Sequence, residues 1–215
     1  MATTTRVAII GAGNVGGALG ARLSKSGIPV KYGVRPETDV KAVLAASKDA
    51  TSASPADAAA WAEVVFLAIP ANVALDVARS LKAPLEGKVV VDCNNPLVWK
   101  EGPVWTPPAE GSLAAAIAAA VPGARVVKGF NTFGAEFHGD PGRAGVAAQV
   151  FLASDDAGAK KLVSELATTA GFRPVDAGPL RNAAVLENVA MLWIHLATVG
   201  GKGRDFTFVM ATKGG

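Results

Sequence analysis

The residues best suited to chemistry lie near the start of the chain, in the run GAGNVG at positions 11–16. An apolar, β-branched stretch precedes this run, and a helical pattern of small residues follows it. In such a strand–turn–helix context, Gly11 permits a tight turn, Gly13 lets a pyrophosphate approach the backbone, and Gly16 lets the helix pack against the strand. The helix N-terminus offers free N–H groups and a positive dipole end to phosphates. The run therefore predicts a dinucleotide site; a glycine-rich turn without a ligand is the alternative.

The end of the next expected strand indicates which dinucleotide would bind. A site that prefers NAD usually carries an acidic residue there, which binds the ribose 2′-hydroxyl. Here Tyr32 and Gly33 are followed by Val34 and Arg35, and the first carboxylate is that of Glu37. The guanidinium of Arg35 offers a fork of donors to a 2′-phosphate, which a carboxylate would repel. We therefore expect NADP(H) rather than NAD(H); an arginine that stacks on adenine or faces solvent is the alternative.

Strand and helix patterns alternate along the chain. Short apolar runs predict strands at 6–10, 28–32, 64–69, 88–92, 125–130, 148–153, 173–176 and 206–210. Helical patterns cover 15–26, 36–47, 55–61, 71–81, 113–120, 156–170 and 182–199, while 94–108 and 137–145 are expected to be loops. This alternation predicts an α/β fold with a Rossmann-like, doubly wound, mostly parallel sheet in three α/β/α layers. We expect one domain over residues 1–215, with a small helical extension from about 180 to 215.

Ligands of doubly wound sheets bind at the carboxyl ends of the strands, so the segments that follow strands are the candidates for the site. Asn94 and Asn95 follow one buried strand and would bond a carboxamide or a ribose, or else stabilise the turn. Asn131 and Thr132 follow another strand, where an amide and a hydroxyl would orient a bound ring. A turn-capping role for Asn131 is the alternative. Phe133 would either stack on that ring or seal the core.

The composition argues against several classes of protein. Half of the 215 residues are hydrophobic and 18% are charged, as expected for a sheet that helices cover on both faces. The net charge of +3 comes without a block of Lys or Arg, which argues against nucleic-acid binding. No apolar run approaches the roughly 20 residues of a membrane span, and the first residues do not resemble a signal peptide. The single cysteine, Cys93, fits a reducing cytoplasm.

The remaining reactive residues give weaker signals. Cys93 has no histidine beside it, so a small buried residue is expected. His138 is expected at the surface of a loop rather than as a gate to the bound ring, and His195 in the core or at an interface rather than as a catalyst. With two histidines and one cysteine, no metal site is expected. The helix at 182–199 is apolar around most of its circumference, which favours a homodimer interface over a helix wholly buried in one subunit.

Four segments together resemble a known family: GAGNVG at 11–16, GVR at 33–35, AIP at 68–70, and DAGPL at 176–180 followed by Asn182 and Glu187. The chain resembles the NADPH-dependent coenzyme F-420 (F420) reductases, also called F420-dependent NADP oxidoreductases. Its fold is similar to the cytoplasmic domain of the STEAP metalloreductases. The resemblance implies direct hydride transfer between NADP(H) and a second substrate, either a deazaflavin such as F420 or a flavin such as FMN or FAD. Transfer between two rings depends on orientation more than on a catalytic acid or base, and none is assigned.

The same resemblance implies roles by position. The pyrophosphate would be held by Gly11, Gly13, Asn14 and Val15. The adenosine 2′-phosphate would lie at Val34 and Arg35, and the nicotinamide with its ribose at Ile69, Pro70 and Ala71. Three positions depart from the family pattern: Val34 replaces a common serine, Asp39 replaces a common basic residue, and Asn131 replaces a histidine of the archaeal deazaflavin pocket. The Asn131-Thr132 pair is similar to the version in the flavin-using metalloreductases.

Two other functions stay open at this point. One is an NADPH-dependent reductase of an imine or a ketone intermediate, although families of that kind add a long helical domain after the shared N-terminal fold. The other is an NADPH-binding sensor without catalysis. The loop at 95–108, with Trp99 and Trp105, would serve either as a substrate lid or as a partner-binding surface.

Overall fold

Six strands form the central sheet of the computed structural model, which describes residues 5–213. In spatial order they are β3 (Thr51–Ala53), β2 (Val30–Gly33), β1 (Val7–Ile10), β4 (Val64–Leu67), β5 (Val89–Asp92) and β8 (Arg125–Lys128). Every neighbouring pair is parallel, which confirms the predicted Rossmann-like sheet. The strand order reverses between β1 and β4, and ligands of such sheets bind beside that point.

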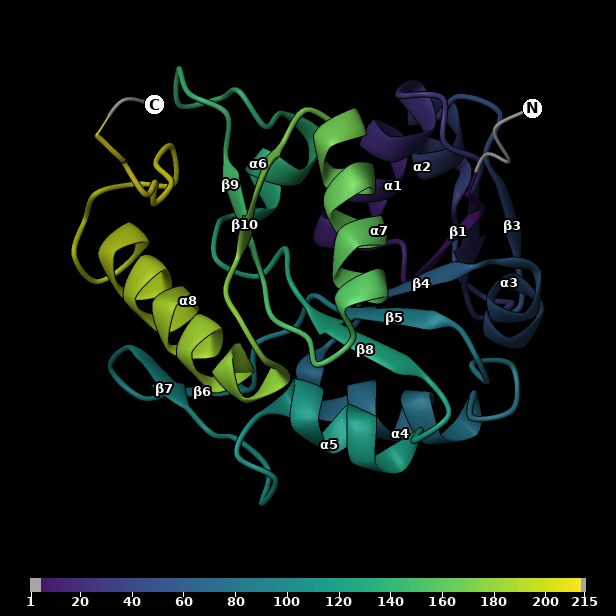
Figure 1. Cartoon of the computed structure of the whole chain (residues 1–215). Coiled ribbons are helices and arrows are strands. Elements are labelled where there is room, and N and C mark those ends of the chain that lie inside the picture. The colour runs from purple at the N-terminus through teal and green to yellow at the C-terminus, as the bar shows by residue number, and fades with distance from the viewer. Residues whose placement is uncertain (1–4, 214–215) are drawn as a thin grey trace.

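Helices cover both faces of the sheet because successive side chains of each strand point to opposite faces. Val7 and Ile9 point into one core, which is closed by α1 (Asn14–Lys25), α2 (Lys41–Ala46), α6 (Ala135–Gly139) and α7 (Ala157–Thr169). Ala8 and Ile10 point into the other core, which is closed by α3 (Pro55–Trp61), α4 (Ala71–Ser80) and α5 (Leu113–Ala120). Figure 1 shows α4 and α5 on one side of the strands and α1 and α7 on the other. The three predicted layers are therefore present.

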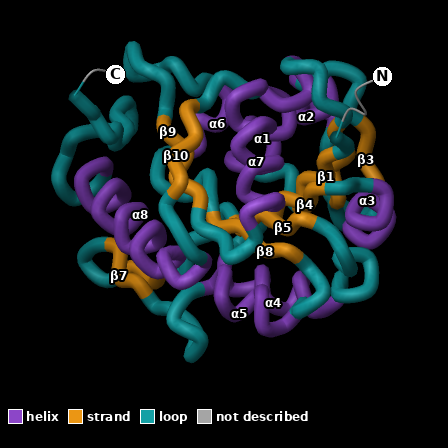
Figure 2. Tube along the Cα trace, viewed as in Figure 1, coloured by secondary structure: helices purple, strands orange, loops and turns teal. Residues whose placement is uncertain are grey.

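A smaller parallel sheet extends beyond β8. It pairs β9 (Gln149–Leu152) with β10 (Arg173–Asp176), and a single antiparallel bridge between Lys128 and Ala153 connects it to the central sheet. Figure 2 shows these two strands beside α7 and α6. Val150 and Leu152 point into the core that α1 and α7 close, so β9 contributes to the same core as the central sheet.

The C-terminal helix lies at the periphery of the molecule. This helix, α8 (Ala183–Ala197), follows a short 3₁₀ turn, η1 (Leu180–Asn182), and lies next to a hairpin of β6 (Leu97–Trp99) and β7 (Pro103–Trp105) (Figure 1). Trp193 is buried, whereas Val185 is 58% exposed and Leu192 is 52% exposed. The alternative of a helix wholly buried in one subunit is therefore wrong. Across residues 5–213, no helix has the combination of length and apolar character that crossing a membrane requires.

Several short elements differ from the sequence-based expectation. α2 begins only at Lys41, because the residues after β2 form a turn in which the Thr38 N–H donates to the Arg35 carbonyl. β3 is not among the predicted strands, and the segment 94–108, expected to be a loop, contains the β6–β7 hairpin; strands of three residues are too short to show a period. Residues 206–210 form no strand; the Met210 backbone instead bonds the side-chain amide of Gln149.

Candidate functional site

The turn between β1 and α1 has the geometry that its glycines predict. Gly11 has a φ of +103°, and a Cβ built there would lie 2.4 Å from the Ala68 carbonyl oxygen. A Cβ on Gly16 would lie 2.2 Å from the carbonyl oxygen of Gly11. A Cβ on Gly13, in contrast, would meet no atom within 4 Å. Gly11 and Gly16 are thus required because backbone atoms approach them closely, whereas Gly13 leaves open space in front of α1.

The N-terminus of α1 has the features of an anion-binding helix end. Gly13 occupies the N-cap position without a side chain that bonds the first-turn N–H groups, and the first turn of α1 carries no acidic residue. Helix N–H groups without a capping partner are satisfied by water or by a ligand, and the helix dipole favours negative charge there. The predicted pyrophosphate residues Gly13, Asn14 and Val15 lie at this helix end, with Gly11 just before it.

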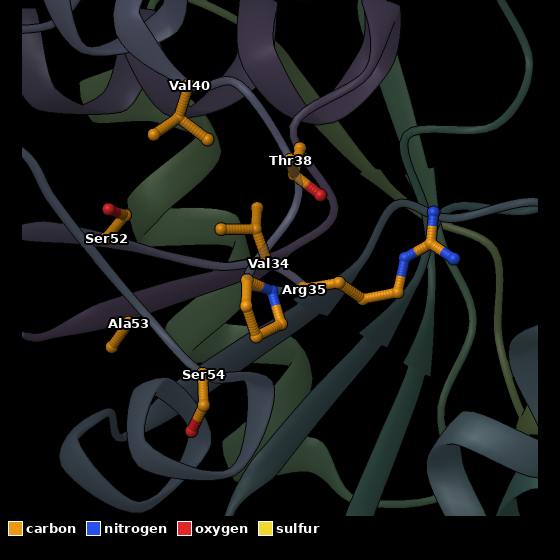
Figure 3. Close-up of a pocket in the computed structure, with 8 residues that line it drawn as sticks. Val34, Arg35, Thr38, Val40, Ser52, Ala53 and Ser54 are labelled. Carbon is orange, nitrogen blue, oxygen red and sulfur yellow. The ribbon is translucent and has the colours of Figure 1, made fainter.

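A cavity of about 410 Å³ lies at the carboxyl ends of β2 and β3. Its walls are Val34, Arg35, Pro36, Thr38, Val40, Ser52, Ala53 and Ser54. Figure 3 shows the Arg35 side chain extending away from Ser52 and Ser54, across the ends of the strands. Two predicted residues, Val34 and Arg35, are therefore brought to one cavity together with hydroxyl groups that sequence reasoning did not single out.

The guanidinium of Arg35 is already paired in this structure. Its Nε lies 3.2 Å from Oε1 of Glu37, and the two side chains are 79% and 65% exposed. An ion pair this exposed is worth little, so Glu37 competes only weakly with a bound phosphate. The sequence placed Glu37 beyond the strand end without showing that its carboxylate faces Arg35.

The residues expected beside the nicotinamide border the phosphate turn. Ile69 and Pro70 follow β4, and Ala71 begins α4 with Pro70 at the N-cap position. The Ile69 side chain reaches the turn, because a Cβ on Gly11 would come within 2.8 Å of its Cγ2. These three residues lie in the crevice where the strand order reverses, as ligand-contacting residues of this fold do.

An amide pair joins the ends of β5 and β8. The Asn131 side-chain amide donates to Oδ1 of Asn95 at 2.9 Å and to the Leu186 carbonyl at 3.1 Å, while the Asn95 amide donates to the Asn131 carbonyl at 2.9 Å. Oδ1 of Asn131 is buried and has no partner among the described residues. The structure thus brings two predicted residues together. Asn94 bonds the Asp92 carboxylate instead, at 2.9 Å from its side-chain amide.

A fully buried cluster of charges lies beneath this pair. Nζ of Lys128 lies 2.8 Å from Oδ2 of Asp92 and 3.3 Å from Oε1 of Glu187, and it also donates to the Asn94 carbonyl. Glu187 further accepts the indole N–H of Trp105 at 2.8 Å and the Leu113 N–H at 3.0 Å. Sequence reasoning missed the cluster; its only local signal is a charged residue at the end of each of two buried strands.

The aromatic segment after β8 is core rather than open surface. Phe133 is buried and lies parallel to Phe172, with ring centroids 5.8 Å apart. Phe133 thus lies in the core, one of the two roles that the sequence left open, and its stacking on a bound ring stays a prediction. Asn131 and Thr132 are buried as well, and none of the three predicted acceptor-pocket residues lines either of the two cavities described in this section.

The expectation for His138 is wrong. The segment 137–145, expected to be a loop, begins inside α6, and His138 on this helix is only 1% exposed. Its Nε2 lies 2.9 Å from the Phe130 carbonyl oxygen, while Nδ1 has no partner among the described residues. Burial lowers the pKa of this imidazole. The error arose because a proline-containing turn at 140–142 hid the short helix before it. His195 is exposed on α8, so the expectation that it lies in the core is also wrong, while its place at an interface stays a prediction.

The two remaining expectations concern Cys93 and metal binding. Cys93 is buried, as expected, and its burial raises the pKa of the thiol well above its usual range. Among the residues that the structure describes, no three His, Cys, Asp or Glu side chains gather in a way that would hold a metal ion.

A second cavity, of about 500 Å³, opens beside the phosphate turn. It is lined by Asn14 at the start of α1, Ala135 and Glu136 at the start of α6, and Arg204 from the segment after α8. Nε of Arg204 lies 2.6 Å from Oε1 of Glu136, and its Nη2 lies 3.3 Å from Oε2. These bonds hold the pKa of the Glu136 carboxyl below its usual range. Neither Glu136 nor Arg204 was singled out from the sequence.

Comparison with known proteins agrees with this geometry. A family model described as "NADP oxidoreductase coenzyme F420-dependent" matches residues 6–96. The F420-dependent NADP reductase of Methanothermobacter marburgensis is 32% identical over 212 residues, which cover 89% of this chain and 92% of the relative. The chain belongs to the family of F420-dependent NADP oxidoreductases. This confirms the resemblance that the four sequence segments indicate.

Other relatives and solved structures are also similar to this chain. A crystal structure of a candidate F420-dependent NADP reductase from Arthrobacter sp. FB24 matches with a TM-score of 0.87 and 31% identity, covering 97% of this chain and all of that one. The metalloreductase STEAP3 of Rattus norvegicus is 31% identical over 186 residues, which are 86% of this chain but 36% of that protein. The reductive aminase of Aspergillus terreus, solved with NADPH, shares the fold at 18% identity and a TM-score of 0.68.

Proposed function

We propose that this oxidoreductase transfers hydride between NADP(H) and a deazaflavin or flavin ring. The observation that carries the nucleotide half of the proposal is the arrangement at one sheet edge. Gly13 leaves open space before the N-terminus of α1, and the Arg35 cavity lies at the ends of the next two strands, β2 and β3, along the same edge. A pyrophosphate fits the first position and an adenosine 2′-phosphate the second. The acceptor half rests on the relatives, which are named for reactions of F420 and NADP.

The residues present fit an NADP nucleotide. The first-turn N–H groups of α1 would bind the pyrophosphate, and Arg35 would exchange its exposed partner Glu37 for the 2′-phosphate. Ile69 would provide an apolar wall in the crevice beside the turn. When bound, NADPH supplies the hydride. The contribution of the chain is to fix the two rings in contact and to exclude water from between them.

The amide pair at the ends of β5 and β8 would orient one edge of the bound rings. Asn95 and Asn131 hold each other through two hydrogen bonds, and the Leu186 carbonyl fixes the Asn131 amide from the other side. Because the amide nitrogen is bonded to two carbonyl oxygens, the unpartnered Oδ1 of Asn131 is an acceptor. Movement of this segment on binding would let that oxygen accept a hydrogen bond from a ligand N–H.

We also propose that the protein forms a homodimer through α8. Val185, Leu192 and Val199 are each more than half exposed on or just after this helix, and Trp99 of the adjacent hairpin is 56% exposed. Large apolar side chains exposed in this number on neighbouring elements are typical of a protein interface. Sedimentation velocity of the wild type and of Leu192→Glu tests this directly; a monomeric wild type would contradict it.

The function is tested by following NADPH oxidation by the purified protein with F420, FMN, FAD, a cyclic imine, and no acceptor. We expect oxidation that depends on a deazaflavin or flavin, with little activity toward the imine. Oxidation only with the imine would support the alternative of an imine or ketone reductase. Tight NADPH binding without turnover in any mixture would support the alternative of a nucleotide sensor.

A further inference from the structure

The cavity beside the phosphate turn is lined in part by a residue distant in the sequence. Arg204 lies beyond α8, and together with Asn14, Ala135 and Glu136 it lines this cavity of about 500 Å³. The chain around Arg204 is held by several contacts. Asp205 pairs with Arg143 at 2.5 Å, and the Phe206 carbonyl accepts the indole N–H of Trp193 at 2.8 Å. Arg204 is therefore presented to the cavity by an anchored segment.

The guanidinium itself is oriented on two sides. Two of its donors, on Nε and Nη2, bond the two oxygens of Glu136. Its central carbon lies 5.3 Å from the ring centroid of Trp193, which itself stacks on Phe206. A guanidinium held by a carboxylate and an aromatic ring is pre-organised, so it loses little freedom when it binds a further group.

Part of this guanidinium stays available. Arginine carries five N–H donors, and Glu136 accepts two of them. No hydrogen bond from Nη1 to another described residue is found, and the Arg204 side chain is 48% exposed. The fork of N–H groups on arginine matches the oxygens of a phosphate or a carboxylate. The free edge of Arg204 is thus suited to an anion inside the cavity.

The anion would belong to the acceptor rather than to the nucleotide. The two phosphate positions of NADP(H) already have partners in the α1 N-terminus and Arg35. Ala135 and Glu136, in contrast, directly continue the segment that begins with Asn131 at the end of β8. Resting on the proposed function, we propose that Arg204 binds a phosphate group of the ring acceptor, so that the enzyme selects phosphorylated deazaflavins or flavins over the bare rings.

The proposal predicts opposite effects for the two partners of the ion pair. Arg204→Gln removes the positive charge, so it should weaken binding of a phosphate-bearing acceptor by about tenfold or more. Glu136→Gln removes the competing negative charge and should strengthen it. Arg143→Gln is the matched control, because Arg143 anchors the same segment through Asp205 but does not line the cavity.

The experiment measures acceptor binding by equilibrium dialysis with NADP⁺ present, which requires no turnover. Two matched pairs differ by a phosphate-bearing side chain: FMN against riboflavin, and F420 against its phosphate-free deazaflavin chromophore. We expect Arg204→Gln to weaken FMN or F420 binding and to leave the phosphate-free partner and NADPH unchanged. The pair that responds identifies the acceptor class.

Three results would overturn the inference. The first is that Arg204→Gln weakens the binding of phosphorylated and bare rings equally. The second is that Arg204→Gln, but not Arg143→Gln, weakens NADPH binding. The third is that the wild type binds neither phosphorylated ligand more tightly than its phosphate-free partner. These outcomes differ from a failure of the proposed function, which would appear as tight ring binding without hydride transfer.

Discussion

The buried ammonium of Lys128 lies 3.3 Å from the carboxylate of Glu187, a residue 59 positions further along the chain. Through this contact the end of β8 is joined to α8, and Glu187 also accepts the Trp105 indole N–H from the hairpin. Three segments that are distant in the sequence therefore meet at one charge cluster. The cluster lies directly beneath the Asn95–Asn131 pair, because Lys128 also bonds the Asn94 carbonyl.

Lys128→Met should destabilise the fold severely. The substitution leaves the carboxylates of Asp92 and Glu187 buried without a cation, and breaking a buried ion pair in this way typically costs about 3–5 kcal/mol. Urea unfolding followed by circular dichroism would measure the loss. Lys161→Met is the control, since its 4.0 Å pair with Glu165 is largely exposed and should contribute little. Equal stability of the two variants would contradict a structural role for the cluster.

Gly13→Ala and Gly16→Ala should separate ligand binding from folding. The new Cβ at position 13 meets no protein atom within 4 Å, so the variant should fold normally but lose NADPH affinity, because the methyl group occupies the approach of the pyrophosphate. The new Cβ at position 16 would lie 2.2 Å from the Gly11 carbonyl oxygen, so that variant should lose about 1–3 kcal/mol of stability. Thermal melts with and without NADPH distinguish the two effects. An unchanged NADPH affinity in Gly13→Ala would contradict the pyrophosphate site.

The sequence predicts well those features that depend on local pattern. The strand–turn–helix around Gly11 and the cap of α3, where the Ser54 hydroxyl accepts the Asp57 N–H, are encoded within a few residues. The parallel sheet follows from the alternation of strands and helices, except for its three-residue edge strand β3. Contacts between distant segments leave no such pattern. Lys128 and Asp92 are 36 residues apart, and Arg204 and Glu136 are 68 residues apart. Neither pair could therefore be predicted from the sequence alone.

His138 should make stability depend on pH. Burial lowers the pKa of its imidazole in the folded state below the value of about 6.5 expected in the unfolded chain. Below about pH 6.5 the unfolded chain therefore binds a proton that the folded chain does not, and the free energy of unfolding falls as the pH decreases toward the folded-state pKa. Above about pH 7 this contribution is constant.

Measurement of urea unfolding between about pH 5 and pH 8 tests this expectation. His138→Gln removes the titrating group, so the acid-side loss of stability should become shallower by at most about 1.4 kcal/mol per pH unit. His195→Gln removes an exposed imidazole on α8 and serves as the control. If the free energy of unfolding of both variants kept the pH dependence of the wild type, a group other than His138 would cause the loss of stability at low pH.

Arg35→Ala should change the choice between nucleotides. The guanidinium lines the cavity at the end of β2, where the 2′-phosphate of NADPH would bind and where NADH has only a hydroxyl. Loss of a charge-assisted, forked interaction should raise the KM for NADPH by about tenfold or more and leave the KM for NADH nearly unchanged. Glu37→Gln should act in the opposite direction, because it removes the carboxylate that pairs with Arg35 at 3.2 Å. Equal changes for both nucleotides would mean that Arg35 contacts the adenine or the solvent, and the preference for NADP(H) would then need another residue to explain it.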